Sequence, residues 1–425
     1  MLIRDGERRL RDFSRQSYRE EVREVAPGVW FVLGMGHSNA VFIEGRTGVL
    51  LVDTLDTLKR GEKLRAVIGE KTGKEVKTIF YTHGHPDHRG GAGAFSDSVS
   101  EIIAFAPASP ALKYSGYLEE IGRRRGERQF GYGLTDEEAI SQGIGPREGI
   151  TRGEHRAFVA PTTLYQQSRV VRDIDGVKVE LVRLPGEAED GMMIWLEQTG
   201  VLCCGDTYYG CFPNLYAIRG GQYRDIAVWI ESLETLRSYP AVCLLPGHTG
   251  AVLGRDQVET TLKNFAGAFD YLLTHTLAGM NAGKSAEELA AELVLPAKYA
   301  ELPYLAEHYG CAEWTIRAIY TAYLGWFDGN PTHLHPLPPA EHAQKTVTLM
   351  GGAPAVLQAA RRAAADGEHQ WCLQLCDLLL DSGDRETDRT ARGQKAAALR
   401  AMAAMETSAN GRHYYLACAR ELEEE

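Results

Sequence analysis

Four side chains that can bind a metal ion fall within six consecutive positions of the chain. They are His83, His85, Asp87 and His88, in the string Thr-His-Gly-His-Pro-Asp-His. The string follows the apolar run 78–81, where we expect a strand to end. Alternate residues of an extended backbone point the same way, so the first two histidines can face one cation while the Asp-His pair on the next turn faces a second.

This short motif supplies at most half of two coordination spheres, so a binuclear site needs further donors. Any single histidine in it could be an ordinary polar residue, but four donors at this spacing after a strand predict a metal site. Mixed imidazole and carboxylate donors suit Zn²⁺, and Mn²⁺ or Fe²⁺ can also accept them. We therefore expect two divalent cations, with zinc as the first choice.

Three further donor-type residues follow later apolar runs, each at a point where a strand should end. Glu187, Asp206 and His248 stand in the strings LPGEAED, CCGDT and LLPGHTG. An α/β scaffold gathers its functional groups at such strand ends. Taken singly, Asp206 could cap a helix and His248 could sit in a turn. Together with the first motif, the three residues complete the donor set that a binuclear site needs.

The elements that would position these donors can be predicted from hydrophobic periodicity. We expect strands at 29–33, 40–44, 49–53, 78–82, 177–184, 192–197, 201–204 and 241–245. We expect helices at 58–69, 223–238 and 257–274. Two mixed sheets flanked by helices would account for this order.

A Gly- and Arg-rich stretch at about 108–175 interrupts the order of strands and helices. An insertion of this length in a compact domain is usually functional, and it could form part of a substrate wall. Alternatively, it is a solvated excursion whose arginines pair with Glu119, Glu120 and Glu127. The sequence leaves both interpretations open.

From about residue 279 onward the sequence changes in composition and consists of Ala-rich amphipathic segments. We expect helices at 285–293, 313–324, 340–350, 353–366, 370–381, 389–405 and 412–423. No residue cluster there has the spacing of a metal site or a nucleophile. Antiparallel helical pairs with apolar faces suit packing against another subunit or onto the catalytic part, so we expect this region to serve assembly.

The composition of the 425 residues argues against several functions. The formal net charge is -11 and both signs are interspersed, so no basic face offers itself to nucleic acid. The first 22 residues are charged throughout and lack the apolar core of a secretory signal, and no apolar run reaches the ~18 residues of a membrane span. We expect a cytoplasmic protein without a membrane span. The adjacent Cys203 and Cys204 lie in an apolar run and should fill core.

The string THGHPDH, with Gly-Asp and Pro-Gly-His downstream, resembles the metallo-β-lactamase superfamily, which binds two metals between the halves of an αββα sandwich. The resemblance implies an α/β fold, namely this sandwich followed by an all-α helical domain. We expect a catalytic domain at 1–275, with its insertion at about 108–175, and a helical dimerisation domain at 276–425. The superfamily alone leaves the substrate open, because lactamases, lactonases, thioesterases, phosphodiesterases and sulfatases share the fold.

Several longer strings resemble one branch of that superfamily, the alkyl sulfatases, also called type III sulfatases. They are YLGWFDGNPTHLHPLPP with the following LMGGAPAVLQAARRA, then LYAIRGGQYRD and FDYLLTHTLAGMNAGKS. The first of these looks like the segment that joins the catalytic domain to the helical dimerisation domain. The resemblance therefore implies a homodimer that hydrolyses alkyl or similar small organic sulfate esters.

The resemblance also assigns roles to the predicted donors. His83 and His85 with Glu187 would hold one metal, and Asp87 and His88 with His248 the other. Asp206 would bridge the two, and Asp87 and Asp206 are the predicted catalytic residues. Glu189 is the fallback for Glu187, because the string EAED offers more than one carboxylate.

A sulfate anchor is the other role that the resemblance assigns. Arg219, with Asn214, would bind the sulfate group, since a planar guanidinium suits such oxygens. The alternative for Arg219 is a surface ion pair, for instance with Asp225. His37, Tyr208 and Tyr209 are within plausible reach of the site but receive no role.

The sequence departs from the alkyl sulfatase pattern in two respects. Those enzymes bridge their metals with Glu, whereas Asp206 is one methylene shorter. They also usually carry a further lipid-binding-like domain, for which we expect no room after the helices of this sequence. Two other functions therefore stay open: a hydrolase of another ester, lactone or amide, and a non-catalytic metal-binding or assembly protein. The metal, the alcohol portion, the bond that breaks and the oligomeric state are beyond the sequence.

Overall fold

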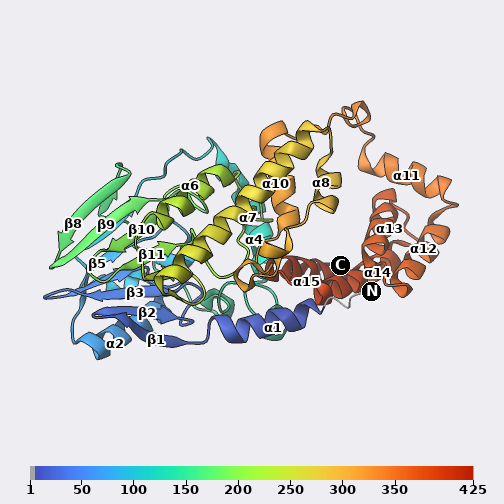
Figure 1. Cartoon of the computed structure of the whole chain (residues 1–425). Coiled ribbons are helices and arrows are strands. Elements are labelled where there is room, and N and C mark those ends of the chain that lie inside the picture. The colour runs from blue at the N-terminus through green and yellow to red at the C-terminus, as the bar shows by residue number, and fades with distance from the viewer. Residues whose placement is uncertain (1–4, 425) are drawn as a thin grey trace.

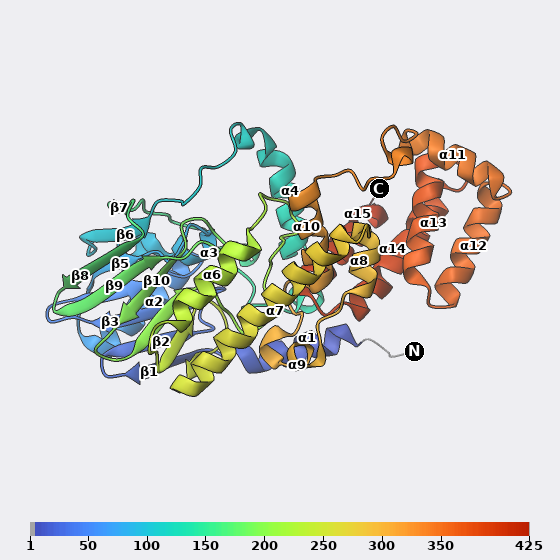
Figure 2. The same cartoon turned by 45° about the horizontal axis from the view of Figure 1, so that its top comes forward.

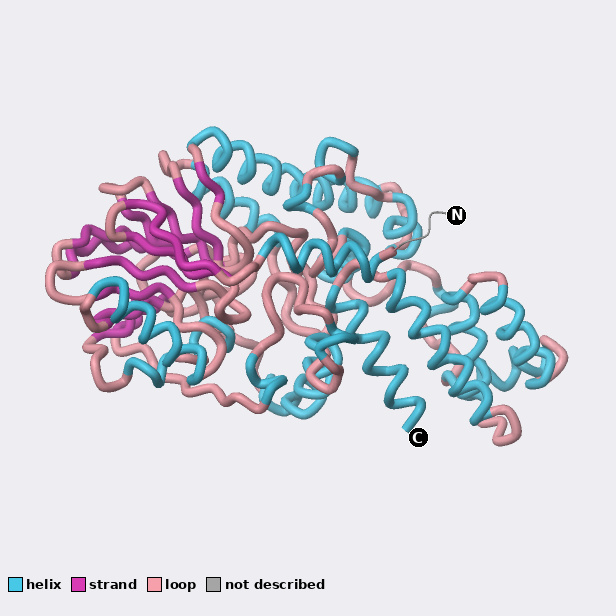
Figure 3. Tube along the Cα trace, turned by 90° about the horizontal axis from the view of Figure 1, so that it is seen from below, coloured by secondary structure: helices cyan, strands magenta, loops and turns pink. Residues whose placement is uncertain are grey.

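The computed structural model describes residues 5–424. Figure 1 shows two sheets gathered at one end of the molecule and a run of helices at the other. Figure 3 gives the same division by colour, with the magenta strands confined to one end. The predicted donors all come from the half that contains the sheets, and the helical end packs beside them.

The first sheet has seven strands, in an order that follows the chain. Its first four strands pair antiparallel and the last four pair parallel. The strands are β1 (Glu21–Ala26), β2 (Val29–Leu33), β3 (Ala40–Glu44), β4 (Val49–Val52), β5 (Val76–Phe80), β6 (Glu101–Phe105) and β7 (Thr163–Tyr165).

The second sheet has six strands in the order β13-β12-β11-β10-β9-β8. Only β11 and β12 pair parallel. The strands are β8 (Arg169–Ile174), β9 (Val177–Arg183), β10 (Met192–Leu196), β11 (Val201–Gly205), β12 (Cys243–Pro246) and β13 (Val252–Leu253).

The two sheets pack face to face, and helices cover their outer faces. Between the sheets, side chains such as Phe80 and Ile194 form one core. Outside the first sheet lies α2 (Leu58–Thr72), whose Leu64 and Ile68 are buried. Outside the second lie α6 (Ile226–Arg237) and α7 (Arg255–Asn281), which share a third core. The predicted αββα sandwich is confirmed.

All of the predicted strands and helices form, and each end lies within seven residues of the expected one. The sequence analysis missed β1, β6, β7, β8 and β13, the helices α1 (Gly6–Ser17) and α4 (Glu119–Phe130), and several four-residue helices. Strand β8 alternates exposed and half-buried positions, as an edge strand does, and α1 buries only Gly6 and Leu10. Such segments carry too few apolar residues to show a clear period. The two cysteines expected in core, Cys203 and Cys204, are buried.

The predicted insertion folds into short elements rather than a loose loop. After the 3₁₀ turn η2 (Ser115–Leu118) come α4 (Glu119–Phe130), α5 (Asp136–Ala139) and η3 (Gly149–Arg152), and then β7 returns to the first sheet. Figure 2 shows α4 reaching across from the sheets to the helical end. Two further short elements follow β5 directly: α3 (Pro86–Arg89) and η1 (Ala92–Phe95).

The helical end begins with α7, which runs through the boundary that we predicted at residue 275. Its Phe265 and Phe269 share one core with Ile316 and Ile319, so the boundary between domains stays a prediction. The remaining helices are α8 (Ala286–Glu292), α9 (Ala297–Ala300), η4 (Pro303–Leu305), α10 (Ala312–Leu324), η5 (Pro331–His333), α11 (Pro339–Leu349), α12 (Ala353–Ala365), α13 (His369–Ser382), α14 (Asp388–Met405) and α15 (Ala409–Glu424).

The last helix, α15, packs on the insertion as well as on α14. The buried ring of His413 hydrogen bonds to the carbonyls of Gln129 and Ala139, and Arg128 pairs with Glu421. No helix in residues 5–424 is both long and apolar enough to cross a membrane. The cytoplasmic location stays a prediction.

Candidate metal centre and anion pocket

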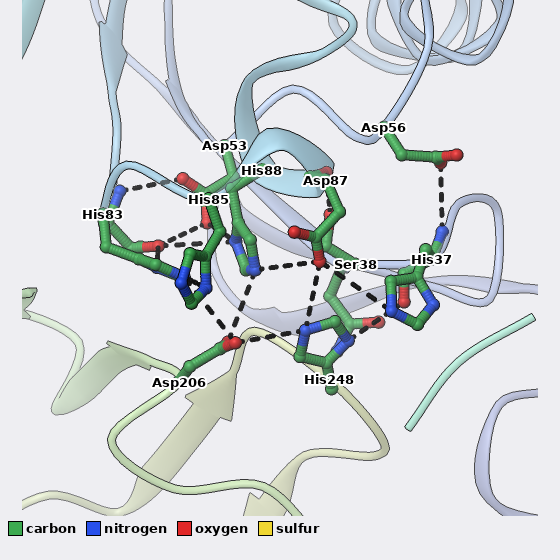
Figure 4. Close-up of polar contacts among 12 residues, drawn as sticks. His37, Ser38, Asp53, Asp56, His83, His85, Asp87, His88, Asp206 and His248 are labelled. Atoms are coloured by element: carbon green, nitrogen blue, oxygen red, sulfur yellow. Dashed lines mark hydrogen bonds and ion pairs between the residues drawn. The ribbon is translucent and has the colours of Figure 1, made fainter. Parts of the chain in front are cut away.

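The predicted donors meet where strands of both sheets end. His83 and Asp87 follow β5, Asp206 follows β11, and His248 follows β12. Figure 4 shows their side chains pointing toward one another from the two sheets. The expectation that an α/β scaffold gathers these groups at its strand ends is thus met by the geometry.

Asp206 lies at the centre of the cluster. Its Oδ2 is 3.2 Å from His248 Nε2 and 3.7 Å from His83 Nε2, and its Oδ1 is 3.5 Å from His88 Nε2. A carboxylate whose two oxygens face histidines on different sides has the placement that a bridging ligand needs. Asp206 reaches this place although it is one methylene shorter than Glu.

Asp87 forms a second focus beside Asp206. Its Oδ2 is 3.4 Å from His88 Nε2 and 3.4 Å from His248 Nε2. Two donors that share one zinc ion at about 2.1 Å and at tetrahedral angles lie about 3.4 Å apart. The grouping of Asp87, His88 and His248 predicted from the resemblance is therefore compatible with the distances.

The structure gathers the donors into three groups, two of which share Asp206. They are His83, His88 and Asp206; His85, Glu187 and Asp206; and His37, Asp87 and His248. His83 lies near both His85, at 2.9 Å between Nε2 and Nδ1, and Asp206. His37, which received no role from the sequence, joins the third group.

Several donor atoms in this cluster are buried and have no hydrogen-bond partner among the described residues. They are His88 Nε2, His248 Nε2, Asp206 Oδ1 and Glu187 Oε2. An orphaned buried polar atom is costly, and an ion that these atoms coordinate would satisfy it. The donor set therefore fits divalent cations.

The opposite nitrogens of the same histidines are held by hydrogen bonds. His88 Nδ1 lies 2.7 Å from Asp53 Oδ2, and His248 Nδ1 donates to the carbonyl of His37 at 3.0 Å. Metal-binding histidines characteristically use the second ring nitrogen in this way, since the hydrogen bond fixes the ring and its tautomer. Asp53 itself adopts a left-handed backbone conformation, φ 59°, directly after β4.

The buried carboxylates of the cluster need compensating positive charge. Burial alone would lower the pKa of His248, but the Asp206 carboxylate raises it to about 10. Burial alone would raise the pKa of Asp206, but His248 and His88 hold it well below its usual range. Buried carboxylates at this density need either protons on the histidines or bound cations.

Gly247 is a position where only glycine fits. A Cβ there would lie 2.1 Å from Asp206 Oδ1 and 2.8 Å from His88 Cε1. The glycine of the Pro-Gly-His string thus lets the β12 end approach the donors of β5 and β11 closely. The two sheets can then share one cluster.

A cavity of about 270 Å³ opens beside the donors. One side of it is formed by His37, His85, Asp87, Glu187, Asp206 and His248. The rest of the lining, called the wall below, includes Phe130, Tyr132, Ile144, Glu148, Arg156, Asn214, Arg219, Arg224 and Tyr309. Three arginines next to a metal-type donor cluster make this cavity suited to an anionic group.

Comparison with known proteins identifies both halves of the chain. A family model described as metallo-beta-lactamase superfamily matches residues 33–248, and one described as alkyl sulfatase dimerisation matches residues 285–425. The linear primary-alkylsulfatase of Pseudomonas sp. (strain ATCC 19151) is 34% identical over 394 residues, which cover 90% of this chain and 73% of the relative. This chain belongs to the alkylsulfatase family of the metallo-β-lactamase superfamily.

Two other alkylsulfatases are similar over nearly the whole chain. The (R)-specific secondary-alkylsulfatase of Pseudomonas sp. is 31% identical over 94% of this chain and 62% of the relative. The solved structure of the stereoselective inverting sec-alkylsulfatase Pisa1 from Pseudomonas sp. has a TM-score of 0.83 at 29% identity, over 95% of this chain and 65% of that one. The chain thus spans less than two thirds of these two proteins. Family and donor set together imply divalent metal ions.

Arg219 and Asn214, the predicted sulfate anchor of this alkylsulfatase, both line the cavity. Among the described residues no carboxylate pairs with Arg219, and Asp225, its alternative partner, instead caps α6. Burial lowers the pKa of Arg219, and the neighbouring Arg224 lowers it further. A guanidinium beside a like charge and without a counterion is well placed to bind an anion.

Glu187 has a second partner besides the metal-type donors. Its Oε1 is 3.0 Å from Arg224 Nη1, while Oε2 is the orphaned atom. Burial raises the pKa of Glu187 to about 7 although Arg224 opposes the shift. Glu189, the fallback ligand, is exposed and belongs to none of the three donor groups.

The insertion turns out to combine both interpretations that the sequence left open. Arg123 is exposed and pairs with Glu120 and Glu127, as in a solvated excursion. Further along, Tyr132 and Glu148 line the cavity, as in a substrate wall. The tip of the insertion is surface, and its later part belongs to the pocket.

Sequence reasoning missed several residues that shape this pocket. Glu148 accepts hydrogen bonds from Tyr132, at 3.0 Å, and from Arg156. Asn410 of α15 donates to Asn214 Oδ1 at 3.1 Å. None of these residues stands in a motif, so only the fold could bring them to the site.

Proposed function

We propose that this alkylsulfatase family member is a binuclear metal-dependent hydrolase that cleaves alkyl or similar organic sulfate esters to an alcohol and sulfate. The observation that carries the proposal is the juxtaposition of two features in one cavity. Five of the seven predicted donors, His85, Asp87, Glu187, Asp206 and His248, line this cavity together with Arg219, which pairs with no carboxylate among the described residues. The similarity to alkylsulfatases supports the substrate class.

We assign the donors to two ions, with zinc as the first choice for imidazole and carboxylate ligands and with Mn²⁺ or Fe²⁺ as alternatives. His83, His85 and Glu187 would hold one ion, and Asp87, His88 and His248 the other, with Asp206 between them. Two bound cations would lower the pKa of a shared water toward neutrality and neutralise charge on the leaving oxygen. Asp87 and Asp206 are the proposed catalytic residues because each faces more than one histidine.

Arg219 and Asn214 would hold the sulfate group against the donor cluster. Within residues 5–424 the Arg219 side chain makes one hydrogen bond, 3.4 Å from Nη1 to the Gly220 carbonyl. Its remaining N–H groups can therefore donate to sulfate oxygens. Asn214 is almost fully buried, and the hydrogen bond from Asn410 to its Oδ1 fixes the orientation of the side-chain amide.

The decisive experiment is release of inorganic sulfate from short and long, primary and secondary alkyl sulfates by the metal-replete protein. A chelator-treated sample is the control, and lactones and phosphate esters form a parallel panel. We expect sulfate release that the chelator abolishes and that added metal restores. Turnover of other esters or lactones with no sulfate release would instead indicate a hydrolase of another ester, lactone or amide. Bound metal without any turnover would indicate a non-catalytic metal-binding or assembly protein.

We also propose that the helical end forms a homodimer. Leu349, Trp326 and Trp371 expose 89%, 73% and 45% of their surface, and all lie in the region that matches the dimerisation model. A dimer would cover these side chains if they form one contiguous patch, since such patches mark interaction sites. Sedimentation analysis at micromolar concentration should return twice the 46.9 kDa chain mass, and a monomer would overturn the proposal.

A further inference from the structure

His37 lies in the loop between β2 and β3 and is buried, with 3% of its surface exposed. Three hydrogen bonds fix it. Its backbone N–H donates to Asp56 Oδ1 at 3.1 Å, its carbonyl accepts from His248 Nδ1, and its ring Nδ1 lies 3.0 Å from the Pro146 carbonyl. Loop, backbone and ring are therefore held in one orientation.

The partner of Nδ1 decides the tautomer of the His37 ring. A carbonyl oxygen can only accept, so Nδ1 carries the hydrogen and the lone pair of the neutral ring is on Nε2. That nitrogen points to the donor cluster, 4.0 Å from Asp87 Oδ2, as Figure 4 shows. The ring that faces the cluster is thus ready to donate an electron pair to a cation.

Three histidines surround Asp87 Oδ2 in the same manner. His88 and His248 turn Nε2 toward this oxygen and bind an outside acceptor through Nδ1. His37 repeats the arrangement, with the Pro146 carbonyl as the outside acceptor. Metal-binding histidines share this arrangement. A histidine with a purely structural role gains nothing by turning its free nitrogen toward a carboxylate that already has two other imidazoles beside it.

We propose that His37 is a further metal ligand, on the side of the cluster that Asp87, His88 and His248 form. The inference deepens the proposed binuclear site and rests on it. Ligand atoms on one ion at about 2.1 Å lie at most about 4.2 Å apart, so the 4.0 Å between His37 and Asp87 is within the range for two ligands at a wide angle. His37, Asp87 and His248 also form one of the three donor groups.

The two metal positions would then differ in their ligands. The position next to Asp87 would have three imidazoles, whereas the position next to Glu187 would have two, with a carboxylate that Arg224 shares. Neutral imidazoles are good zinc ligands, and a carboxylate in an ion pair donates less charge to a cation. The ion on the Asp87 side would be the more firmly bound of the two.

The test is zinc binding without substrate, measured by competition with a chromophoric chelator. In His37→Asn the shorter amide can still donate to the Pro146 carbonyl but has no atom at the place of Nε2. We expect one of the two ions to bind at least about tenfold more weakly, with the other little changed. His308→Asn is the matched control, because His308 is also buried but stacks on Phe13 away from the donors.

Unchanged affinities of both ions in His37→Asn would overturn the inference, as would an equal loss at both ions together with a lower unfolding temperature of the metal-free protein. X-ray absorption of the unmodified zinc protein provides a readout that no variant affects. The spectrum should fit five imidazole ligands shared between the two ions. A fit with four imidazole ligands would contradict the inference. If the unmodified protein binds only one ion, the binuclear site itself fails; if it binds two without sulfate release, only the substrate was assigned wrongly.

Discussion

The two sides of the cavity are built in different ways. The donor side consists of residues at strand ends of both sheets, and most of them stand in short recognisable strings. The wall comes from the insertion, the segment after β11 and the helical end, and its residues stand in no motif that has a chemical signature of its own. The comparison suggests that the donor side determines the reaction, while the wall determines which anion enters.

The largest expected effect is on the donor side. His85→Ala and Asp206→Ala should each lose metal and sulfatase activity together, because each removes a donor that lies in the shared cluster. The activity loss should exceed the roughly 10–100-fold that changes outside a first coordination sphere cause. Metal analysis and sulfate release are measured on the same samples. Asp97→Ala, which removes an exposed carboxylate, is the control, and full metal content in both site variants would refute the donor assignment.

Arg219→Ala tests the wall at its charged point. Loss of a guanidinium that binds the substrate anion should lower kcat/KM for alkyl sulfates by about 10²–10³-fold and leave the metal content unchanged. Arg219→Lys should recover only part of the activity, since a single ammonium cannot replace the planar fork. Arg123→Ala, in the exposed part of the insertion, should behave like the unmodified protein. Equal kinetics for Arg219→Ala and Arg123→Ala would remove Arg219 from the site.

Asn410→Ala asks whether the helical end contributes to the wall. The variant removes the hydrogen bond that orients Asn214 but touches no donor. The variant also removes the hydrogen bond from Asn410 to the Tyr309 carbonyl at 3.3 Å. Misplacement by about 1 Å can cost about 10²-fold in rate, so the loss of both contacts should lower kcat/KM by about tenfold. Steady-state kinetics on one alkyl sulfate measure it. A change that appears only in thermal stability would mean that Asn410 supports the fold and not the pocket.

Glu148→Gln is expected to change stability and not the donor cluster. Burial raises the pKa of Glu148 from 4.5 to about 7, although Arg156 opposes the shift. The folded state therefore keeps a proton that the unfolded state has lost between about pH 4.5 and 7, and stability falls as the pH rises through this window. The variant lacks this titration. As the pH rises from 5 to 7.5, its free energy of unfolding should therefore increase by up to roughly 3 kcal/mol relative to that of the unmodified protein, at 1.36 kcal/mol per pKa unit. Urea unfolding of metal-free samples tests this, and parallel pH profiles would contradict it.

The sandwich and the seven donors could be predicted because their signals are local. A strand followed by His83, His85 and Asp87 keeps its meaning whatever the rest of the chain does. His37 was not assigned a role because one histidine in the string GHSNA carries no spacing signal. Its place near Asp87 depends on the pairing of the β2–β3 loop with Pro146, 109 residues away.

The wall could not be predicted for a related reason. Asn214 and Asn410 are 196 residues apart, and Glu148 meets Arg156 only because the insertion folds back on itself. Asn and Glu are ordinary surface residues in most contexts, so their burial is a consequence of tertiary packing and not of any periodic pattern. The insertion was found by its length, but which of its residues face the cavity was not.

The burial of His413 between the insertion and α15 affects how such proteins can diverge. Its ring joins the carbonyls of Gln129 and Ala139 from the far end of the chain, three residues beyond Asn410. A recombination event that exchanged the last helices between two relatives would therefore replace the residue that orients Asn214 in the pocket as well as the assembly surface. In this lineage, selectivity and quaternary structure would be inherited as one unit.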